Sequence, residues 1–238
     1  MNSQRPEIVV GDVESLRQRL RALVSQAAAG AAADGRRWSM AIPGGSVVPQ
    51  LLAALRPGDA PWDRCDLFWV DERAVPWTDP NSNYAQARAA WLDALAPAGV
   101  RLHPIPVDEA TLEACTQRYE RTLREVLGER ATLDLAIVGV GEDGHVASLF
   151  PGDDVALTSP DLVVAVANSP KPPPRRLSLT LRALAGARTV VVAAFGAAKA
   201  PAMRAALHDG HWELPIARLL RDASHVNVLL DEAAAARR

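Results

Sequence analysis

The stretch at residues 133–152, LDLAIVGVGEDGHVASLFPG, decides the fold of this chain. It opens with an apolar run at residues 133–140, whose length and β-branched content are typical of a strand buried on both faces. The run then breaks into a turn in which Gly139, Gly141 and Gly144 allow close backbone approaches that a Cβ atom would forbid. The stretch therefore predicts a buried strand that delivers a glycine-rich loop.

Asp143 and His145 lie inside that loop. In open α/β sheets, ligands bind at the carboxyl ends of the parallel strands, which is where such a loop lies. A carboxylate and an imidazole at this position are candidates for chemistry. The alternative is a tight strand-to-helix turn in which Asp143 caps the next helix and His145 is a satisfied polar residue. For an isolated Gly-Asp-Gly-His this alternative is the favoured interpretation.

Strands and helices are expected to alternate on both sides of this stretch. Apolar runs predict strands at residues 7–11, 38–42, 67–70, 100–105, 162–167, 189–194 and 226–230. Helical spacing predicts helices at residues 12–33, 46–55, 82–95, 112–127 and 195–207, and a polar loop is expected at 153–159. Because no linker separates two cores, the pattern predicts one α/β domain over residues 1–238. Its sheet should be doubly wound and mostly parallel, with helices on both faces.

Composition narrows the class of protein. The chain has 238 residues, of which 49% are hydrophobic and 23% charged, the balance of a soluble globular protein. A net charge of −2 argues against a nucleic-acid-binding surface. The two cysteines, Cys65 and Cys115, have neither metal-ligand spacing nor a disulfide framework, so we expect a reducing, cytoplasmic location. No signal peptide or membrane span is expected.

A second glycine turn follows the predicted strand at residues 38–42. Pro43, Gly44 and Gly45 form the turn, and Ser46 begins the next predicted helix. Glycines that admit a ligand, a hydroxyl and the free N–H groups of a helix N-terminus together favour an anion. A flexible turn with Ser46 as an N-cap is the more common meaning of this pattern taken alone.

Cations follow three other predicted elements. Arg73 closes the sequence Asp71-Glu72-Arg73 after a strand, where a solvated, salt-bridged edge is the simpler interpretation. Lys199 lies on the first turn of a predicted helix, where the helix dipole disfavours a cation unless an anion compensates. A solvated lysine is the alternative there.

The third cationic segment is SPKPPPRR at residues 169–176. Its prolines could mark a polyproline docking segment or a linker. Because an apolar run resumes at once at Leu177, an ordered segment is also possible. Proline fixes φ, so such a segment can hold Lys171, Arg175 and Arg176 with little conformational freedom left to lose.

Several separated blocks, spread over almost the whole chain, resemble 6-phosphogluconolactonases of the glucosamine/galactosamine-6-phosphate isomerase superfamily. The central stretch is similar to G-x-G-x-D-G-H-x-A-S-L-F-P-G, and residues 169–180 to P-K-P-P-x-R-(I/L)-(S/T)-L-T. The run WVDERAVP with its later SNY, and the G-x-x-K ending at Lys199, follow the same family. In the turn that is usually S-G-G-S-T-P, Pro43 replaces the first Ser and Val47 the Thr.

The resemblance implies a Rossmann-like fold and hydrolysis of 6-phospho-D-glucono-1,5-lactone to 6-phospho-D-gluconate, the second step of the oxidative pentose phosphate pathway. It implies that His145 acts as base and then as acid, and that Asp143 sets its tautomer or places the water. It assigns the substrate phosphate to Arg73, Lys199, Ser46 and Arg176, and the ligand loops or oxyanion contacts to Gly44, Gly45, Gly141 and Gly144.

No cofactor and no metal are expected, and the expected partner is the sugar-phosphate lactone, without nucleic acid or membrane. Residues 139–144 satisfy G-x-G-x-x-G as a string. However, Pro151 and Gly152 interrupt the helix that a dinucleotide site needs, and the next strand ends at Asn168 instead of an acidic residue. The sequence does not fix the oligomeric state, for which a monomer is favoured.

Two alternative functions stay open. A glucosamine-6-phosphate deaminase-type isomerase carries D-E-Y where this chain has Asp71-Glu72-Arg73, and A-F-N-E-P where it has residues 147–151. Both differences favour the lactonase. A sugar-phosphate sensor that binds without turnover is the other alternative, and the intact pair of Asp143 and His145 argues against it.

Overall fold

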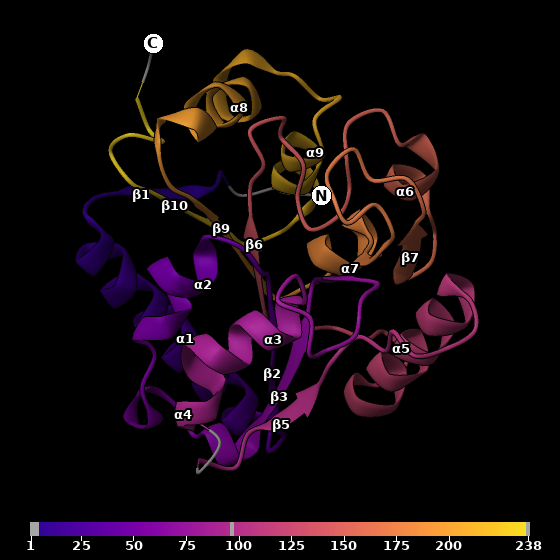
Figure 1. Cartoon of the computed structure of the whole chain (residues 1–238). Helices are drawn as coiled ribbons and strands as arrows, with labels where there is room; N and C mark the ends of the chain where they lie inside the picture. Colours follow the sequence, from indigo (N-terminus) through magenta and orange to yellow (C-terminus); the bar gives the residue numbers. More distant parts are fainter. Residues whose placement is uncertain (1–4, 96–97, 237–238) are drawn as a thin grey trace.

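The computed structural model describes residues 5–95 and 98–236, whose strands form two sheets (Figure 1). Every neighbouring pair of strands in the larger sheet is parallel. Its seven strands follow the order β1 (Glu7–Val10), β10 (Val226–Leu230), β9 (Thr189–Ala194), β6 (Leu135–Gly139), β2 (Trp38–Ile42), β3 (Cys65–Trp69) and β5 (Arg101–His103). The predicted parallel α/β sheet is therefore confirmed, with β6 at its centre.

Helices cover both faces of this sheet, as predicted. Figure 1 shows α1 to α4 on one side and α7, α8 and α9 on the other, while α5 packs against a smaller sheet. The helices are α1 (Val13–Ala33), α2 (Val47–Gln50), α3 (Asn83–Ala87), α4 (Asp93–Leu95), α5 (Leu112–Leu127), α6 (Asp154–Thr158), α7 (Leu181–Ala185), α8 (Ala200–Arg204) and α9 (Pro215–Asp222). Within the described ranges, no helix is long and apolar enough to cross a bilayer.

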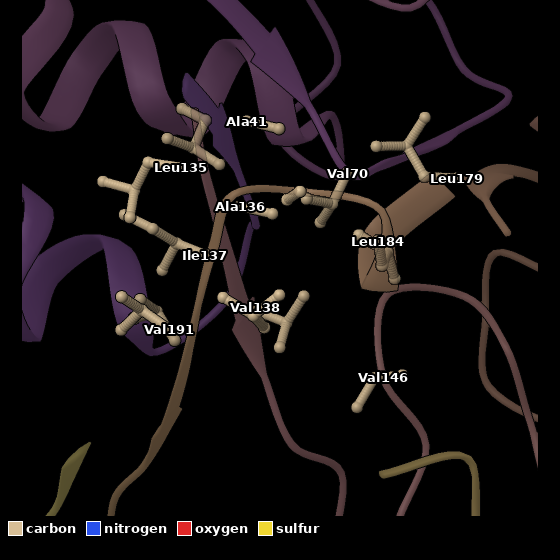
Figure 2. Close-up of a cluster of buried hydrophobic side chains, with 14 of the residues drawn as sticks. Ala41, Val70, Leu135, Ala136, Ile137, Val138, Val146, Leu179, Leu184 and Val191 are labelled. Atoms are coloured by element: carbon tan, nitrogen blue, oxygen red, sulfur yellow. The ribbon is translucent and has the colours of Figure 1, made fainter. Parts of the chain in front are cut away.

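The core lies on both faces of β6. Leu135, Ile137 and Val138 of this strand are fully buried, as the apolar run predicted. Figure 2 shows them in one cluster with Val191 of β9 and Leu184 of α7. Burying large aliphatic side chains on both faces stabilises a parallel strand by about 1.5–3 kcal/mol for each side chain. The loop after β6 is thus attached to a strand that is buried on both faces.

A smaller antiparallel sheet, which we did not predict, lies beside the main one. Its order is β4 (Asp71–Arg73), β8 (Arg176–Leu179) and β7 (Val163–Val166). Residues 71–73, which were expected at the end of the strand predicted at 67–70, instead form the separate strand β4, with Arg73 paired to Arg176 in the register. This pairing brings two cationic segments that are far apart in the sequence to one place.

Several helical segments differ from prediction. The helix expected at 46–55 is reduced to α2 and a 3₁₀ turn, η1 (Leu52–Ala54). The helix expected at 82–95 contains a π-helical turn, η4 (Arg88–Leu92), and that at 195–207 is divided into η6 (Ala197–Lys199), α8 and η7 (Ala205–Asp209). Helices this short are stabilised by packing more than by propensity, so periodicity alone does not define them.

The polar loop expected at 153–159 is wrong, because α6 forms there. The Asp153 carboxylate accepts a hydrogen bond from the Ala156 N–H at 3.1 Å and caps the helix, and Ala156 and Leu157 are buried. The N-terminus of α1 is capped in the same way, since the Asp12 carboxylate accepts from the Ser15 N–H at 2.7 Å.

Candidate active site

A polar cavity of about 170 Å³ opens at the carboxyl ends of β2 and β6. Other hollows are larger, including one of about 580 Å³ beside α5, but this one brings the predicted site residues together. The site residues that line it are Gly44, Gly45, Ser46, Arg73, Gly141, His145, Arg176 and Lys199. The other two, Asp143 and Gly144, belong to the same loop as His145. Three cations and one carboxylate, Asp71, face the cavity, so its charge suits an anionic ligand.

His145 and Asp143 form a pair in the loop that follows the carboxyl end of β6. The ring Nδ1 of His145 lies 2.5 Å from the Asp143 Oδ1, which leaves Nε2 as the free ring nitrogen. The ring also packs on Phe150, with centroids 4.6 Å apart. The alternative in which Asp143 caps the next helix is wrong, because α6 begins only at Asp154.

The charges of the pair are set by its surroundings. Burial lowers the pKa of His145, although Asp143 opposes this shift. For Asp143, burial opposes ionisation, but His145 and the nearby Lys171 outweigh it and hold the pKa of the carboxyl below its usual value. At neutral pH the pair is therefore an ionised carboxylate beside a neutral imidazole, the state that a general base requires.

Gly141 makes room for this pair. A Cβ atom on Gly141 would lie 2.0 Å from the His145 Nδ1 and 2.4 Å from the Asp143 Oδ1. Gly144 has a different requirement, since its φ of +81° is in the region that favours glycine. The two glycines of the loop are thus needed for space and for backbone conformation respectively.

The N–H groups of these two glycines are already used inside the loop. The Gly141 N–H donates to the His145 carbonyl at 2.8 Å, and the Gly144 N–H donates to the Gly141 carbonyl at 3.0 Å. Oxyanion contacts were among the roles expected for these amides. Either amide could make such a contact only if its hydrogen bond inside the loop were broken. Their observed role is to hold His145 in place.

The Pro43–Ser46 turn offers free donors instead. Among the hydrogen bonds of the described residues, none uses the N–H groups of Gly44, Gly45 or Ser46 or the Ser46 hydroxyl. Gly44 approaches Asn83 so closely that a Cβ would lie 1.8 Å from the Asn83 Oδ1. Because α2 is a single turn and Ser46 makes no cap, the expected helix dipole contributes little, and anion binding depends on these local donors.

Arg73 enters the cavity with an unused donor. Its Nη1 donates to the Asn81 carbonyl at 2.7 Å, which fixes the guanidinium. Its Nε is buried without a hydrogen-bond partner among the described residues. That nitrogen is shielded from the cavity, whereas no hydrogen bond from Nη2 is found among the described residues, so Nη2 is the donor left for an acceptor in the cavity.

The two acids before Arg73 build the wall of the cavity. Glu72 is buried and accepts hydrogen bonds from the Ser82 hydroxyl at 2.9 Å and from the Asn83 N–H at 2.6 Å, so it caps α3. Burial raises the pKa of Glu72 even though backbone N–H groups oppose the shift. Asp71 accepts from the Ser148 hydroxyl at 2.7 Å. Asp71 and Glu72 therefore position the backbone of the segment that carries Arg73. In the described part of the chain, neither carboxylate forms a hydrogen bond with the guanidinium of Arg73.

Arg176 is only 5% exposed, and most of its N–H groups donate to the proline segment, residues 169–176. Its Nε donates to the Pro173 carbonyl at 3.0 Å, and its Nη2 donates to the carbonyls of Lys171 at 2.9 Å and Pro172 at 3.2 Å. These hydrogen bonds hold the segment in place, in agreement with the ordered segment that the apolar run at Leu177 favoured. Arg176 lines the cavity, and only its Nη1 is available to a ligand. The sole hydrogen bond of Nη1 among the described residues is a long one, 3.4 Å from the Ser148 hydroxyl.

Lys199 is held by the turn after β9. The Gly196 N–H donates to the Asp231 carboxylate at 2.9 Å, and the Lys199 N–H donates to the Gly196 carbonyl at 3.0 Å. The Lys199 ammonium lies 3.9 Å from the Glu142 carboxylate, which supplies the anion that this position requires. Glu142 was not predicted from the sequence. Its contact with Lys199 joins two loops that are distant in the sequence, so no local pattern indicates it.

No metal site accompanies these residues. Across residues 5–95 and 98–236, no group of three or more His, Cys, Asp or Glu side chains is placed to hold an ion. Cys65 and Cys115 are free and buried.

Comparison with known proteins gives these features a context. Residues 11–229 match the family described as glucosamine-6-phosphate isomerases/6-phosphogluconolactonase. The chain is 36% identical over 242 residues to the 6-phosphogluconolactonase of Rattus norvegicus, covering 95% of this chain and 91% of the relative. It is 36% identical over 248 residues to that of Streptomyces coelicolor, covering 98% and 95%. The crystal structure of 6-phosphogluconolactonase from Leishmania guyanensis matches with a TM-score of 0.83 and 26% identity, covering 98% of each chain.

Proposed function

Because the chain belongs to the family of glucosamine-6-phosphate isomerases and 6-phosphogluconolactonases, we propose that it hydrolyses 6-phospho-D-glucono-1,5-lactone through His145 and Asp143. It is a hydrolase of the pentose phosphate pathway, and its product is 6-phospho-D-gluconate. One observation supports the mechanism most directly: His145, paired to Asp143, lines the same cavity as Arg73 and Lys199.

His145 acts on both halves of the reaction. Its free Nε2 accepts a proton from a water molecule, whose oxygen attacks the lactone carbonyl carbon. When the tetrahedral intermediate breaks its bond to the ring oxygen, the imidazolium returns the proton to that oxygen, which becomes the C5 hydroxyl. Asp143, which binds Nδ1 at 2.5 Å, keeps Nε2 unprotonated at the start and stabilises the imidazolium that forms.

The cations hold the substrate phosphate. Arg73 offers its Nη2, and a planar guanidinium matches phosphate oxygens in a way that an ammonium does not. Lys199 exchanges Glu142 for the phosphate, and the Ser46 hydroxyl with the amides of Gly44 and Gly45 completes the pocket. Arg176 contributes less, because most of its donors bind the proline segment.

We further propose that residues 1–238 form one lactonase domain that works as a monomer in the cytoplasm. One continuous hydrophobic core joins the elements that carry the site. The free buried cysteines suit a reducing compartment.

The decisive experiment generates the lactone in situ by oxidising glucose 6-phosphate and compares its decay with and without the protein. A parallel assay measures ammonia release from glucosamine 6-phosphate. We expect fast lactone decay and no ammonia. Ammonia release would indicate the deaminase-type isomerase, and tight 6-phosphogluconate binding without catalysed decay would indicate a sensor.

Arg73→Lys is expected to raise KM for the lactone about thirtyfold, because the loss of one charge-assisted hydrogen bond costs about 2 kcal/mol. The positive charge is kept, so the effect isolates the geometry of the guanidinium. Initial rates against lactone concentration measure it. Arg175→Lys is the matched control, since Arg175 lies in the same part of the molecule but does not line the cavity. An unchanged KM in Arg73→Lys would remove Arg73 from the phosphate site.

The pH dependence of kcat/KM follows from the pKa of His145. A general base works unprotonated, so activity is full above this pKa and is lost as the pH falls through it. Because burial lowers the pKa of His145, the acidic limb should lie below 6.5, the ordinary value for histidine. Rates are measured after subtracting the uncatalysed hydrolysis at each pH. A limb above 6.5 would contradict this assignment.

A further inference from the structure

Lys171 reaches the Asp143–His145 pair from outside the glycine loop. Its ammonium lies 3.7 Å from the Asp143 Oδ1, the same oxygen that binds the His145 Nδ1 at 2.5 Å. The side chain of Lys171 is 45% exposed, and it does not line the cavity. Its charged partner among the described residues is Asp143. Its charge acts on the carboxylate of the pair.

The backbone of Lys171 is held by side chains. Its carbonyl accepts from the Arg176 Nη2 at 2.9 Å and from the Ser169 hydroxyl at 2.9 Å, and its N–H donates to the same hydroxyl at 3.2 Å. The Ser169 N–H donates to the Pro174 carbonyl at 2.8 Å, which closes the segment into a loop. Such fixation reduces the freedom that a lysine loses when it forms an ion pair.

Arg176 connects the same loop to the other side of His145. Its guanidinium carbon lies 5.7 Å from the centre of the Phe150 ring, and that ring packs on the His145 imidazole. The successive contacts therefore form a ring that begins and ends at His145 and passes through Phe150, Arg176, Lys171 and Asp143. A displacement of the proline segment would reach His145 from both sides.

We propose that Lys171 is a positioning residue that acts through Asp143, balancing its charge so that the carboxylate orients His145 without holding a proton on it. An unbalanced carboxylate beside an imidazole favours the imidazolium, which cannot act as a base. The ammonium of Lys171 opposes that tendency, and Arg176 fixes the backbone of Lys171 through its carbonyl. The inference rests on the proposed function, in which His145 begins the reaction unprotonated.

Other charged groups also surround His145. Those of its own loop are Asp143 and Glu142, and those from the other elements that form the cavity wall and rim are Asp71, Arg73, Lys171, Arg176 and Lys199. Of these, Lys171 is the cation that contacts the carboxylate of the pair. Its removal should therefore change the titration of His145 more than the loss of a cation elsewhere on the proline segment.

The test compares the acidic limb of kcat/KM in Lys171→Met, Lys171→Arg and Arg175→Met. Removing the ammonium should move the limb of Lys171→Met to higher pH by about half a unit, the size expected for a half-exposed charge a few ångströms away. Lys171→Arg keeps the charge and should keep the native limb. Arg175→Met removes one positive charge from the same segment and should also keep it. An unmoved limb in Lys171→Met, or an equal shift in Arg175→Met, would overturn the proposal.

An NMR titration of the His145 ring separates this inference from the proposed function. It reports the pKa of His145 in the wild type and in Lys171→Met without any substrate, and His145→Gln identifies the resonance. We expect the same upward shift as in the kinetics. If the wild type hydrolysed no lactone, the proposed function would fail, but the NMR shift would still decide whether Lys171 sets the charge of the pair.

Discussion

Replacing His145 with alanine is expected to lower kcat for lactone hydrolysis by about three orders of magnitude, the contribution typical of a positioned general base and acid. Binding of 6-phosphogluconate should change little, because the cations that hold the phosphate belong to other elements. Stopped assays of lactone decay and calorimetric titration with 6-phosphogluconate measure the two effects.

Two comparisons show whether the loss arises from the imidazole. Added imidazole should partly restore the rate of His145→Ala, since the substitution leaves space beside Phe150 in an open cavity. Asp143→Asn keeps the ring but removes the carboxylate that orients it, so its kcat should lie between those of the wild type and His145→Ala. Unchanged turnover in His145→Ala would discard the general-base assignment.

The main sheet could be predicted because its strands carry a local signal. β2, β9 and β10 fall within the residues expected, since each is a mostly apolar run whose side chains are buried on both faces. In the smaller sheet, β7 lies within the apolar run predicted at residues 162–167, but the pairing of the three strands has no comparable signal. β4 is three residues long, and its pairing with β8 joins segments that are distant in the sequence.

The candidate site shows the same division. The motif residues meet in one cavity because the carboxyl ends of neighbouring parallel strands meet at one edge of the sheet. The contacts of Lys171 with Asp143 and of Glu142 with Lys199 join separate loops, so they depend on tertiary placement. The sequence indicated that Gly141 belongs to the turn, but not that its N–H donates to the His145 carbonyl.

Replacing Gly141 with alanine is expected to lower kcat about a hundredfold while the fold is kept, since a misplacement of about 1 Å at a catalytic group has this effect. The added Cβ would lie 2.0 Å from the His145 Nδ1 and 2.4 Å from the Asp143 Oδ1, so the two side chains must separate. Both are ends of side chains, and the φ of Gly141 is outside the positive region, so the backbone tolerates alanine.

Gly30→Ala is the matched control, because a Cβ there meets nothing within 4 Å and the position lies inside α1. It should keep native kcat and raise the free energy of unfolding by up to about 1 kcal/mol. The double variant Gly141→Ala with His145→Ala should be no slower than His145→Ala alone, since both changes remove the same pair. Native kcat in a folded Gly141→Ala protein would show that catalysis does not need the 2.5 Å contact between Asp143 and His145.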